Sequence, residues 1–368
     1  MEKTTSYPKW DAPYFTGKKI EKIYCFPWCT EKFHPENTIR FQSRANAEQA
    51  GYRPCRKCCS TLPIGAWTDK QSELTLVVPK EFSFNENMKY LSKEPNECLF
   101  YCKNHRIYRA IPIEAETPVV EIRSDQDNML HIRFLGTTMP SCKWIRAEVV
   151  RYVRDWFDLD TDLRPFYDLA KSDALLQRAV TTFSGLRNIG IPDLFEAICW
   201  GIIGQQINLP FAYTLKRRLV KAFGRSIECD DETYWIFPSP HDIAALTIED
   251  LKGLQMTGKK CEYLIGVAQL MVEGKITKEQ LGNCGDYKKA ENMLVKIRGI
   301  GPWTANYVLM RCLRMPSAFP IDDVGLHNAI KYLQGTPQKP TKAEIVKLSA
   351  TWTNWEAYAT FYLWRFLY

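Results

Sequence analysis

Two pairs of cysteines near the beginning of the chain have the spacing of metal ligands. Cys25 and Cys29 are separated by three residues, and Cys55 and Cys58 are separated by two. Each pair could hold one ion from a single loop, and four thiolates suit a tetrahedral zinc ion. Cys59 competes with Cys58 for the fourth position. The alternative is four unrelated buried thiols, which the doubled spacing disfavours, so one zinc ion is expected.

A second group of residues with chemical potential lies in the segment 293–307. Its sequence, MLVKIRGIGPWTANY, predicts a helix, a tight turn through Gly299 and Gly301, and a second helix that begins at Pro302. The N–H groups at the start of the second helix could bind phosphate oxygens without reading the base sequence. Positive charge nearby comes from Lys296, Arg298 and Arg311. A simple corner between two helices is the alternative.

An acidic pair follows this hairpin in the sequence. Asp322 and Asp323 lie in the segment AFPIDDVGL, between an apolar stretch and the next predicted helix. A carboxylate beyond a phosphate-binding hairpin could stabilise a cationic sugar transition state or activate a water molecule. The alternative is a structural role as a helix N-cap, for which Asp is also well suited.

The predicted elements divide the 368 residues into three regions. Residues 1–66 hold five of the 13 Cys, residues 67–140 carry short β-branched and aromatic runs that predict an antiparallel sheet, and residues 141–368 have the period of helices. The predicted strands are 74–78, 99–103, 107–111, 119–122 and 130–134. The main predicted helices are 212–223, 248–254, 259–272, 287–297, 303–313 and 355–366. The expected fold class is therefore α+β, with several domains.

The composition excludes several classes of protein. Hydrophobic residues make up 45% of the chain and charged residues 25%, which argues against disorder. No apolar run approaches the roughly 20 residues that cross a bilayer, and the start of the chain lacks a signal-peptide pattern, so secretion and membrane insertion are not expected. The Cys content then favours metal ligation and buried thiols in a reducing compartment over a disulfide framework. The net charge of +7 agrees with a polyanionic partner without establishing one.

The cysteine module resembles the N-terminal zinc domain of the Ada family of methylation-repair proteins. The resemblance rests on the sequences IYCFPWC, PENTIRF and AEQAGYRPCRKC, which lie within residues 23–58. It implies that Cys25, Cys29, Cys55 and Cys58 bind one zinc ion, and that Cys25 accepts a methyl group from an alkylated DNA phosphate. Zinc would hold that thiol as a thiolate, the nucleophilic form. A purely structural or DNA-anchoring zinc is the alternative.

The rest of the chain resembles the helix-hairpin-helix DNA glycosylase superfamily, and within it the AlkA type of 3-methyladenine glycosylase. The resemblance spans roughly residues 72–368. It rests on the sequences AICWGIIGQQI, FPSP, GIGPWTANY and YATFYLW and on the acidic pair. It implies an antiparallel sheet domain followed by a two-lobed, mostly α-helical domain that contains the helix-hairpin-helix.

The same resemblance assigns roles to individual residues. Asp323, the second of the acidic pair, matches the catalytic Asp of the superfamily. Trp303 and Trp364 would form the walls of the base pocket, with Tyr307 as a further candidate, and Gln206 would insert into the gap left by the extruded base. The residues implied at the DNA backbone are Gly299, Gly301 and Thr304. A monovalent cation at the hairpin is also compatible with the resemblance.

The expected reaction is the release of alkylated purines, of the 3-methyladenine and 7-methylguanine class, from double-stranded DNA in base excision repair. Superfamily members that also cut the strand have Lys where this chain has Trp303, so a monofunctional glycosylase is expected. The C-terminal sequence FYLWRFLY lacks the cysteines of an iron–sulfur cluster, so none is expected. A non-catalytic sensor of alkylated DNA and an oxidised-guanine glycosylase are the alternatives. The protein is expected to be a cytoplasmic, DNA-associated monomer.

Overall fold

The N-terminal module is a small sheet with its own core. The computed structural model describes residues 14–25, 34–42, 46–47, 50–55, 67–113, 115–125, 129–140, 143–284 and 286–367. The strand order of the module is β3-β1-β2-β4, in which β2 and β4 are parallel. Its elements are β1 (Phe15–Lys18), β2 (Ile23–Cys25), the 3₁₀ helix η1 (Pro35–Asn37), β3 (Thr38–Phe41) and β4 (Arg53–Pro54). Its hydrophobic cluster is separate from the rest of the core and includes Phe15, Tyr24, Phe41, Tyr52, Cys25 and Cys55.

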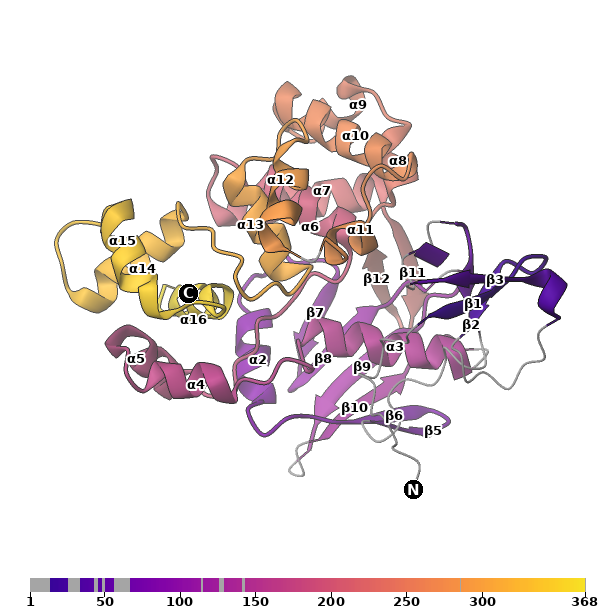
Figure 1. Cartoon of the computed structure of the whole chain (residues 1–368), viewed down its shortest axis with the longest axis horizontal. Helices are drawn as coiled ribbons and strands as arrows, with labels where there is room; N and C mark the ends of the chain where they lie inside the picture. The colour runs from indigo at the N-terminus through magenta and orange to yellow at the C-terminus, as the bar shows by residue number, and fades with distance from the viewer. Residues whose placement is uncertain are drawn as a thin grey trace.

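A six-stranded antiparallel sheet follows, with the order β5-β6-β10-β9-β8-β7 (Figure 1). Five of its strands correspond to the predicted runs, whereas β5 and the helix α2 (Phe84–Leu91) were not predicted. Asn104 and His105 both have positive φ, 51° and 56°, as a tight two-residue hairpin turn requires. The strands are β5 (Trp67–Lys70), β6 (Glu73–Val77), β7 (Phe100–Lys103), β8 (Arg106–Ala110), β9 (Val119–Ser124) and β10 (Met129–Phe134).

The remainder is mostly helical, as predicted, and its helices form two lobes (Figure 1). Helix α3 (Lys143–Trp156) lies across one face of the sheet. The first lobe contains α6 (Leu194–Ile203), α7 (Leu209–Phe223), α8 (Pro240–Ala244), α9 (Ile248–Lys252), α10 (Gly258–Val272), α11 (Lys278–Gly282), α12 (Tyr287–Val295) and α13 (Pro302–Arg311). The second lobe contains α4 (Arg164–Ala170), α5 (Ala174–Thr182), α14 (Val324–Gln334), α15 (Lys342–Leu348), the 3₁₀ helix η2 (Ser349–Thr351) and α16 (Glu356–Trp364).

Several of these elements were not predicted. The hairpin of β11 (Arg225–Cys229) and β12 (Glu232–Ile236) interrupts the helical region and packs beside β8. The hydroxyls of Tyr101 in β7 and Tyr234 in β12 are 2.7 Å apart. Helices α4, α5 and α15 were also missed, whereas α14 is the helix predicted after the acidic pair. Within the described ranges, no helix combines the length and the apolar character that crossing a membrane demands.

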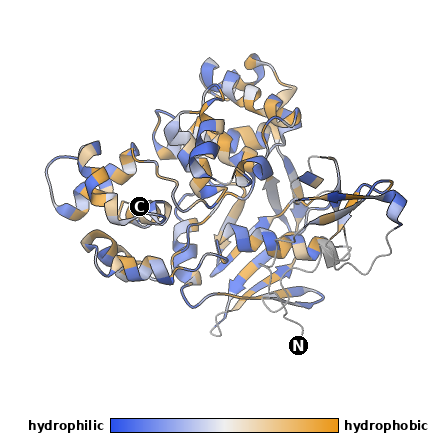
Figure 2. Ribbon diagram, viewed as in Figure 1, coloured by the Kyte–Doolittle hydropathy of each residue, from blue (hydrophilic) through white to orange (hydrophobic). Residues whose placement is uncertain are grey.

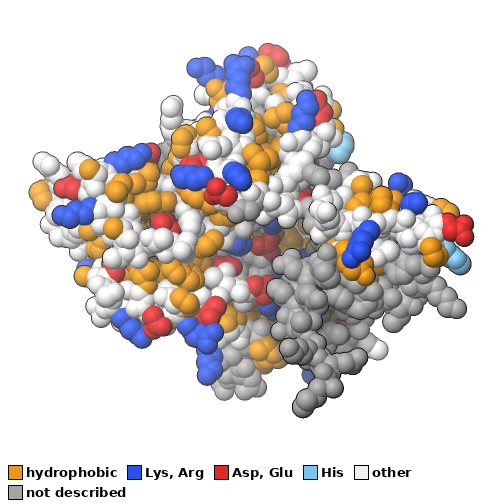
Figure 3. All heavy atoms as spheres, in the orientation of Figure 1, with side chains coloured by type: hydrophobic (Ala, Val, Ile, Leu, Met, Phe, Trp, Pro, Cys, Tyr) orange, Lys and Arg blue, Asp and Glu red, His pale blue; other side chains and the backbone are white. Residues whose placement is uncertain are grey.

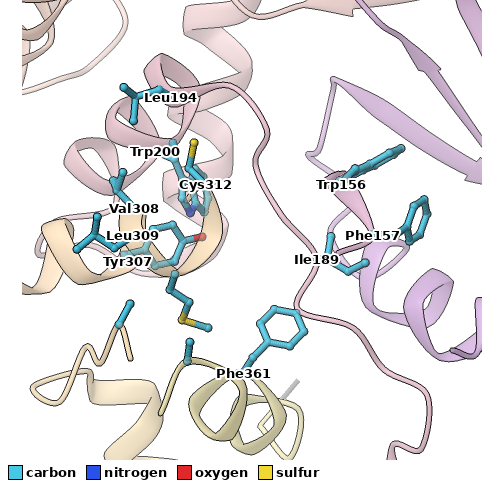
Figure 4. Packing of buried hydrophobic residues seen from close by; sticks show 14 of the residues in the cluster. Trp156, Phe157, Ile189, Leu194, Trp200, Tyr307, Val308, Leu309, Cys312 and Phe361 are labelled. Atoms are coloured by element: carbon cyan, nitrogen blue, oxygen red, sulfur yellow. The ribbon is translucent and has the colours of Figure 1, made fainter. Parts of the chain in front are cut away.

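One continuous hydrophobic core joins the sheet, α3 and both lobes. Figure 2 shows hydrophobic residues in stripes along the helices, and Figure 4 shows Trp156 at the end of α3 opposite Trp200, Tyr307 and Phe361 of the lobes. On the outer surface in Figure 3, hydrophobic side chains gather over the second lobe. The sheet and the lobes are thus one packed unit, on which the relative positions of α6, α13 and α16 depend.

A charged cavity of 420 Å³ lies between α3, α11 and the end of α13. Lys278 and Arg314 both bind Asp155 of α3, at 2.7 and 3.1 Å. Arg154, also on α3, pairs with Asp160. The Arg314–Asp155 pair holds the segment after α13 against α3, and the Lys278–Asp155 pair holds α11 there.

A buried group of charged side chains joins the sheet to the first lobe. Lys216 of α7 lies 3.1 Å from Glu97, which precedes β7, and 3.0 Å from Glu196 of α6. Arg109 of β8 lies 3.6 Å from Glu196 and 4.6 Å from the Trp156 ring. Burial acts to raise the pKa of Glu97, but Lys216 holds it below its ordinary value. Burial acts to lower the pKa of Lys216, but the two carboxylates raise it. Both groups are therefore charged at neutral pH.

Lys216→Met should lower the free energy of unfolding by about 3–5 kcal/mol, because it leaves the buried Glu97 carboxylate without a cation and Glu196 with Arg109 alone. Urea denaturation at neutral pH measures this. Lys252→Met is the matched control, since Lys252 is exposed and pairs with Glu249 at 3.4 Å; its effect should stay below about 1 kcal/mol. The free energy of unfolding should also decrease as the pH falls from 4.5, the ordinary pKa of a glutamate, through the lowered pKa of Glu97. A carboxyl group of lowered pKa stabilises the fold only while it is ionised. Equal stability of the two variants would contradict the role of the network.

Candidate active site

The predicted hairpin lies between α12 and α13, and glycine is required at its turn. Gly299 has a φ of +94°, and a Cβ there would lie 2.3 Å from the Tyr263 ring. Gly301 is the N-cap of α13, and Pro302 begins the helix. Glycine has no side chain that could accept a hydrogen bond from the first N–H groups of the helix. The start of α13 therefore has the geometry of an anion-binding helix N-terminus.

Gln205 fixes the hairpin to the end of α6. Its side-chain amide donates to the Gly299 carbonyl at 2.9 Å and to the Thr304 hydroxyl at 3.2 Å. Thr304 is buried, and a Cβ at Gly201 would come within 2.6 Å of its methyl group, so α6 and α13 are in close contact. Sequence reasoning missed Gln205, whose only signal was its place beside Gln206. The contact of Thr304 with the DNA backbone stays a prediction.

Gln206, the predicted wedge, is exposed at the turn between α6 and α7. Its φ is +57°, a left-handed conformation that is uncommon and strained for a residue other than glycine. Leu209 and Phe211 at the start of α7 are also partly exposed, at 39% and 36%. The turn thus presents polar and apolar side chains to solvent close to the hairpin, and the insertion of Gln206 into DNA stays a prediction.

The three basic residues expected near the hairpin lie in two different places. Lys296 and Arg298 are exposed beside it, and Arg298 pairs with Glu262 at 2.7 Å. Arg311 lies at the opposite end of α13 and is only 6% exposed. Ten helical residues place it about 15 Å along the axis from the hairpin, so it does not share in phosphate binding there.

Asp323 is the N-cap of α14 and binds groups from three helices. Its Oδ1 accepts hydrogen bonds from the Leu326 N–H at 2.7 Å and from Trp364 Nε1 at 2.8 Å. Its Oδ2 accepts from Trp303 Nε1 at 2.7 Å. Asp322 is exposed and pairs with Lys342 at 2.8 Å. The two members of the acidic pair therefore have different surroundings. Asp323 has the N-capping role that was given as the alternative, and it also lies between two tryptophans.

Trp303, Tyr307 and Trp364 form a row of aromatic rings beside Asp323. The rings of Trp303 and Tyr307 are stacked, with centroids 5.4 Å apart. The rings of Tyr307 and Trp364 are 6.3 Å apart and tilted by 31°. The row thus joins α13 of the first lobe to α16 of the second, and it brings together the three residues expected in the base pocket with the expected catalytic Asp.

The two described cysteines of the N-terminal module lie on neighbouring strands. Cys25 ends β2 and Cys55 directly follows β4, while the preceding residues Tyr24 and Pro54 are paired in parallel register. The Cys55 N–H donates to the Tyr24 carbonyl at 2.8 Å. Neighbouring strands are about 4.8 Å apart, which suits two thiolate ligands of one ion. The remaining expected ligands lie outside the described residues: Cys29, Cys58 and the competing Cys59.

Gly325→Ala should separate Asp323 from Trp364 and destabilise the protein. A Cβ at Gly325 would lie 2.9 Å from Asp323 Oδ1 and 3.2 Å from Trp364 Nε1, and such overpacking costs about 1–3 kcal/mol. The matched control is Gly266→Ala in α10, where a Cβ meets nothing within 4 Å and better helix propensity adds about 1 kcal/mol. Thermal unfolding and tryptophan fluorescence measure both variants. A Gly325 variant as stable as the Gly266 variant would show that the contact is not tight.

Three sequence families match parts of the chain. The HhH-GPD superfamily of base excision DNA repair proteins matches residues 199–354, which include the hairpin and Asp323. The metal-binding domain of Ada matches residues 3–60. The N-terminal domain of 8-oxoguanine DNA glycosylase matches residues 98–198, which include most of the sheet and α3.

Individual relatives agree with these matches. The DNA-3-methyladenine glycosylase of Bacillus subtilis is 50% identical over 302 residues, which cover 82% of this chain and 99% of the relative. The structure of a 3-methyladenine DNA glycosylase from Archaeoglobus fulgidus matches with a TM-score of 0.68 at 21% identity, over 79% of this chain and 97% of the other. An 8-oxoguanine glycosylase/lyase from Clostridium acetobutylicum matches with a TM-score of 0.64 at 18% identity, over 82% and 99%. These two structures show a shared fold. The chain belongs to the DNA-3-methyladenine glycosylase family within the HhH-GPD superfamily, and it carries an Ada-type metal-binding domain.

Proposed function

We propose that this protein is a monofunctional DNA glycosylase that releases alkylated purines, of the 3-methyladenine and 7-methylguanine class, from double-stranded DNA. The observation that carries the proposal is the Asp323 carboxylate, held between the indole N–H groups of Trp303 and Trp364. The names of the relatives in Bacillus subtilis and Escherichia coli support this substrate class. The protein would act in base excision repair as a cytoplasmic, DNA-associated monomer.

Asp323 would stabilise the positive charge that develops on the sugar as the glycosidic bond breaks. Its three hydrogen bonds fix the carboxylate before DNA binds, so little reorganisation accompanies the reaction. A carboxylate has about four acceptor positions, so about one remains for the sugar or for the water that captures it. Trp303 stands where strand-cutting relatives have Lys, so no amine is available there for a Schiff base.

The aromatic row explains why alkylated purines would be preferred. N3- and N7-alkylated purines carry positive charge, and a cation over an aromatic face gains about 0.5–2 kcal/mol that a neutral base does not. The ring centroids of Tyr307 and Trp364 are 6.3 Å apart, and the rings are tilted by 31°. A flat base between two rings would need about 7–8 Å, twice the contact distance of carbon atoms, so the two rings would have to move apart. Damaged bases unstack at lower cost and are thus selected before they reach Asp323.

The DNA would lie across the hairpin. The N–H groups at Gly301 and the following residues would bind phosphate oxygens, and exposed Lys296 and Arg298 would add non-specific attraction. Gln206, exposed on the adjacent turn, would fill the gap left by the flipped nucleotide. Occupation of the hairpin by a monovalent cation stays a prediction. A protein that bound DNA through this surface but released no base would be the non-catalytic sensor given above as an alternative.

Asp323→Asn should abolish base release and leave DNA binding largely intact, because the amide still caps α14 but carries no negative charge. Base release is measured as 3-methyladenine and 7-methylguanine freed from methylated duplex DNA. DNA binding is measured with a duplex that contains an abasic site. Asp322→Asn is the matched control, since Asp322 is exposed and bound to Lys342. Wild-type protein should leave abasic but uncut strands. Turnover by the Asp323 variant would refute its role, and no release even by wild type would favour the sensor.

We further propose that the N-terminal module binds one zinc ion through Cys25, Cys29, Cys55 and Cys58. The match to the Ada metal-binding domain and the adjacent positions of Cys25 and Cys55 support it. When bound, zinc keeps the thiols as thiolates. The Cys25 sulfur would then attack the methyl carbon of a methyl phosphotriester. The S–C bond forms while the C–O bond breaks, and the phosphodiester leaves with the electron pair.

Incubation with DNA that contains methyl phosphotriesters should add about 14 Da to Cys25, one methyl replacing one hydrogen. Peptide mass spectrometry detects the change, and base release by Asp323 should be unaffected. Cys102→Ser serves as the control, since Cys102 lies in β7 outside the module. Unmodified Cys25 in zinc-loaded protein would contradict methyl transfer. The metal would then have the structural or DNA-anchoring role given as the alternative.

A further inference from the structure

We propose that Asn306 is a positioning residue, which sets the distance between the hairpin and the Asp323 carboxylate. The inference rests on the proposed function, in which the hairpin holds the DNA backbone while Asp323 acts on the sugar. It concerns the segment of the chain that joins these two groups.

The segment between α13 and α14 returns along α13 toward the hairpin. A series of hydrogen bonds connects it to the helix, at helical positions that come closer to the hairpin as the segment proceeds. These bonds join Met315 with Leu309, Phe319 with Asn306, and Asp323 with Trp303. In this series, the bond to Asn306 is the one that precedes the Asp323 carboxylate.

A shift at Phe319 would reach Asp323, because the residues between them are braced by hydrogen bonds of their own. The Ile321 N–H donates to the Phe319 carbonyl at 2.8 Å. The Asp323 N–H donates to the Pro320 carbonyl at 2.9 Å. These residues therefore form a compact turn, one end of which is fixed by Asn306.

The hydrogen-bonding capacity of the Asn306 amide is fully used, and the residue is only 3% exposed. Its Oδ1 accepts from the Phe319 N–H at 2.9 Å and from the Tyr287 hydroxyl at 3.1 Å. Its Nδ2 donates to Glu291 Oε1 at 2.6 Å and to the Pro302 carbonyl at 2.9 Å. A carboxylate and a carbonyl only accept, whereas a backbone N–H only donates, so the amide has one possible orientation.

Asn306 thereby joins both helices of the hairpin to the segment that carries Asp323. Tyr287 and Glu291 belong to α12, and Pro302 begins α13, which lies beside α12 (Figure 1). Reacting groups must be held within about 0.5 Å of their productive positions, and a misplacement of about 1 Å can cost about 100-fold in rate. The amide therefore contributes to the rate of base release through Asp323, without contact with the substrate.

Asn306→Asp keeps the shape of the side chain and removes both donors. The introduced carboxylate would face Glu291 Oε1 and the Pro302 carbonyl without a proton between them, so the contact would open. Single-turnover release of 7-methylguanine from duplex DNA should then be slower by about 10- to 100-fold at a pH of about 8.5. The affinity for the duplex should change little, because the hairpin N–H groups remain.

The loss should diminish as the pH falls, because protonation returns a donor to the introduced carboxyl group. Burial and the charge of Glu291 raise the pKa of such a group by about 2–4 units above about 3.9. The other charged groups nearby are Lys288, which pairs with Glu291 at 2.8 Å, and Glu356 at the start of α16, which acts on the Tyr287 hydroxyl. The rate relative to wild type, corrected for uncatalysed release, should therefore rise between about pH 8.5 and about pH 5.5.

Glu291→Gln, combined with Asn306→Asp, exchanges donor and acceptor across the same contact. The glutamine amide can donate to the introduced carboxylate, so the double variant should recover most of the rate at every pH. Tyr287→Phe removes one donor to Oδ1 and keeps the ring, and it tests the same link where Asn306→Asp does not fold. Its rate should fall about 2- to 10-fold, the effect of one neutral hydrogen bond.

Asn87→Asp is the matched control. Asn87 is also buried, in α2, where its Nδ2 donates to the Ser83 and Gly185 carbonyls at 2.7 and 3.0 Å. Its Oδ1 accepts from the Arg187 N–H at 2.9 Å. This variant should lower the stability, and with it the amplitude of the single turnover, which measures the folded protein. Its rate constant should stay that of wild type.

A rate constant of Asn306→Asp that equals wild type would overturn the proposal. A rate that stays low at every pH and in the double variant would also overturn it, since Asn306 would then be a packing residue. Loss of amplitude alone would show that Asn306 acts only on stability. Wild-type protein that releases no base would instead refute the proposed function itself.

Discussion

The hydrogen bonds of the Asp323 carboxylate join segments that are far apart in the sequence. The indole of Trp303 comes from the first lobe, whereas the indole of Trp364 and the N–H of Leu326 come from the second. The bonds therefore define how the two lobes meet. Gly325 permits this approach, because any side chain there would occupy the space of the carboxylate and the indole. The chemistry of the site and the contact between the lobes cannot be altered independently.

Trp303 reaches the carboxylate because α13 is fixed at both of its ends. Gln205 and the close contact with Gly201 hold its first turn, and the residues after the helix are tied to α3 through Arg314 and Asp155. The buried network around Lys216 in turn ties α6 and α7 to the sheet. A site built on rigid elements keeps its dipoles oriented before the substrate arrives, which is the condition for electrostatic catalysis.

Local patterns in the sequence were sufficient for five of the six strands of the central sheet, for most helices of the first lobe and for the hairpin, because alternation, helical period and paired glycines report on neighbours along the chain. They did not predict the β11–β12 hairpin, whose polar strands have no strong alternation and gain stability beside β8. The pocket residues followed from a family resemblance, but their bonds to Asp323 did not. Arg311 was misplaced for the same reason: its charge is evident in the sequence, whereas its burial is decided by α16 and Tyr90, far away in the chain.

Under the proposed function, Trp364 would connect substrate selection to chemistry. Its ring lies 6.3 Å from the Tyr307 ring, centroid to centroid, and its indole N–H donates to Asp323 Oδ1. In the proposed function, a base inserted between these two rings would displace an indole that also holds the carboxylate. Separation of the rings and release of one acceptor position on Asp323 would then be one movement. An undamaged base, which gains no cation–π attraction, would provide less energy for this movement. The carboxylate would consequently be most available to the sugar when a cationic base lies beside it.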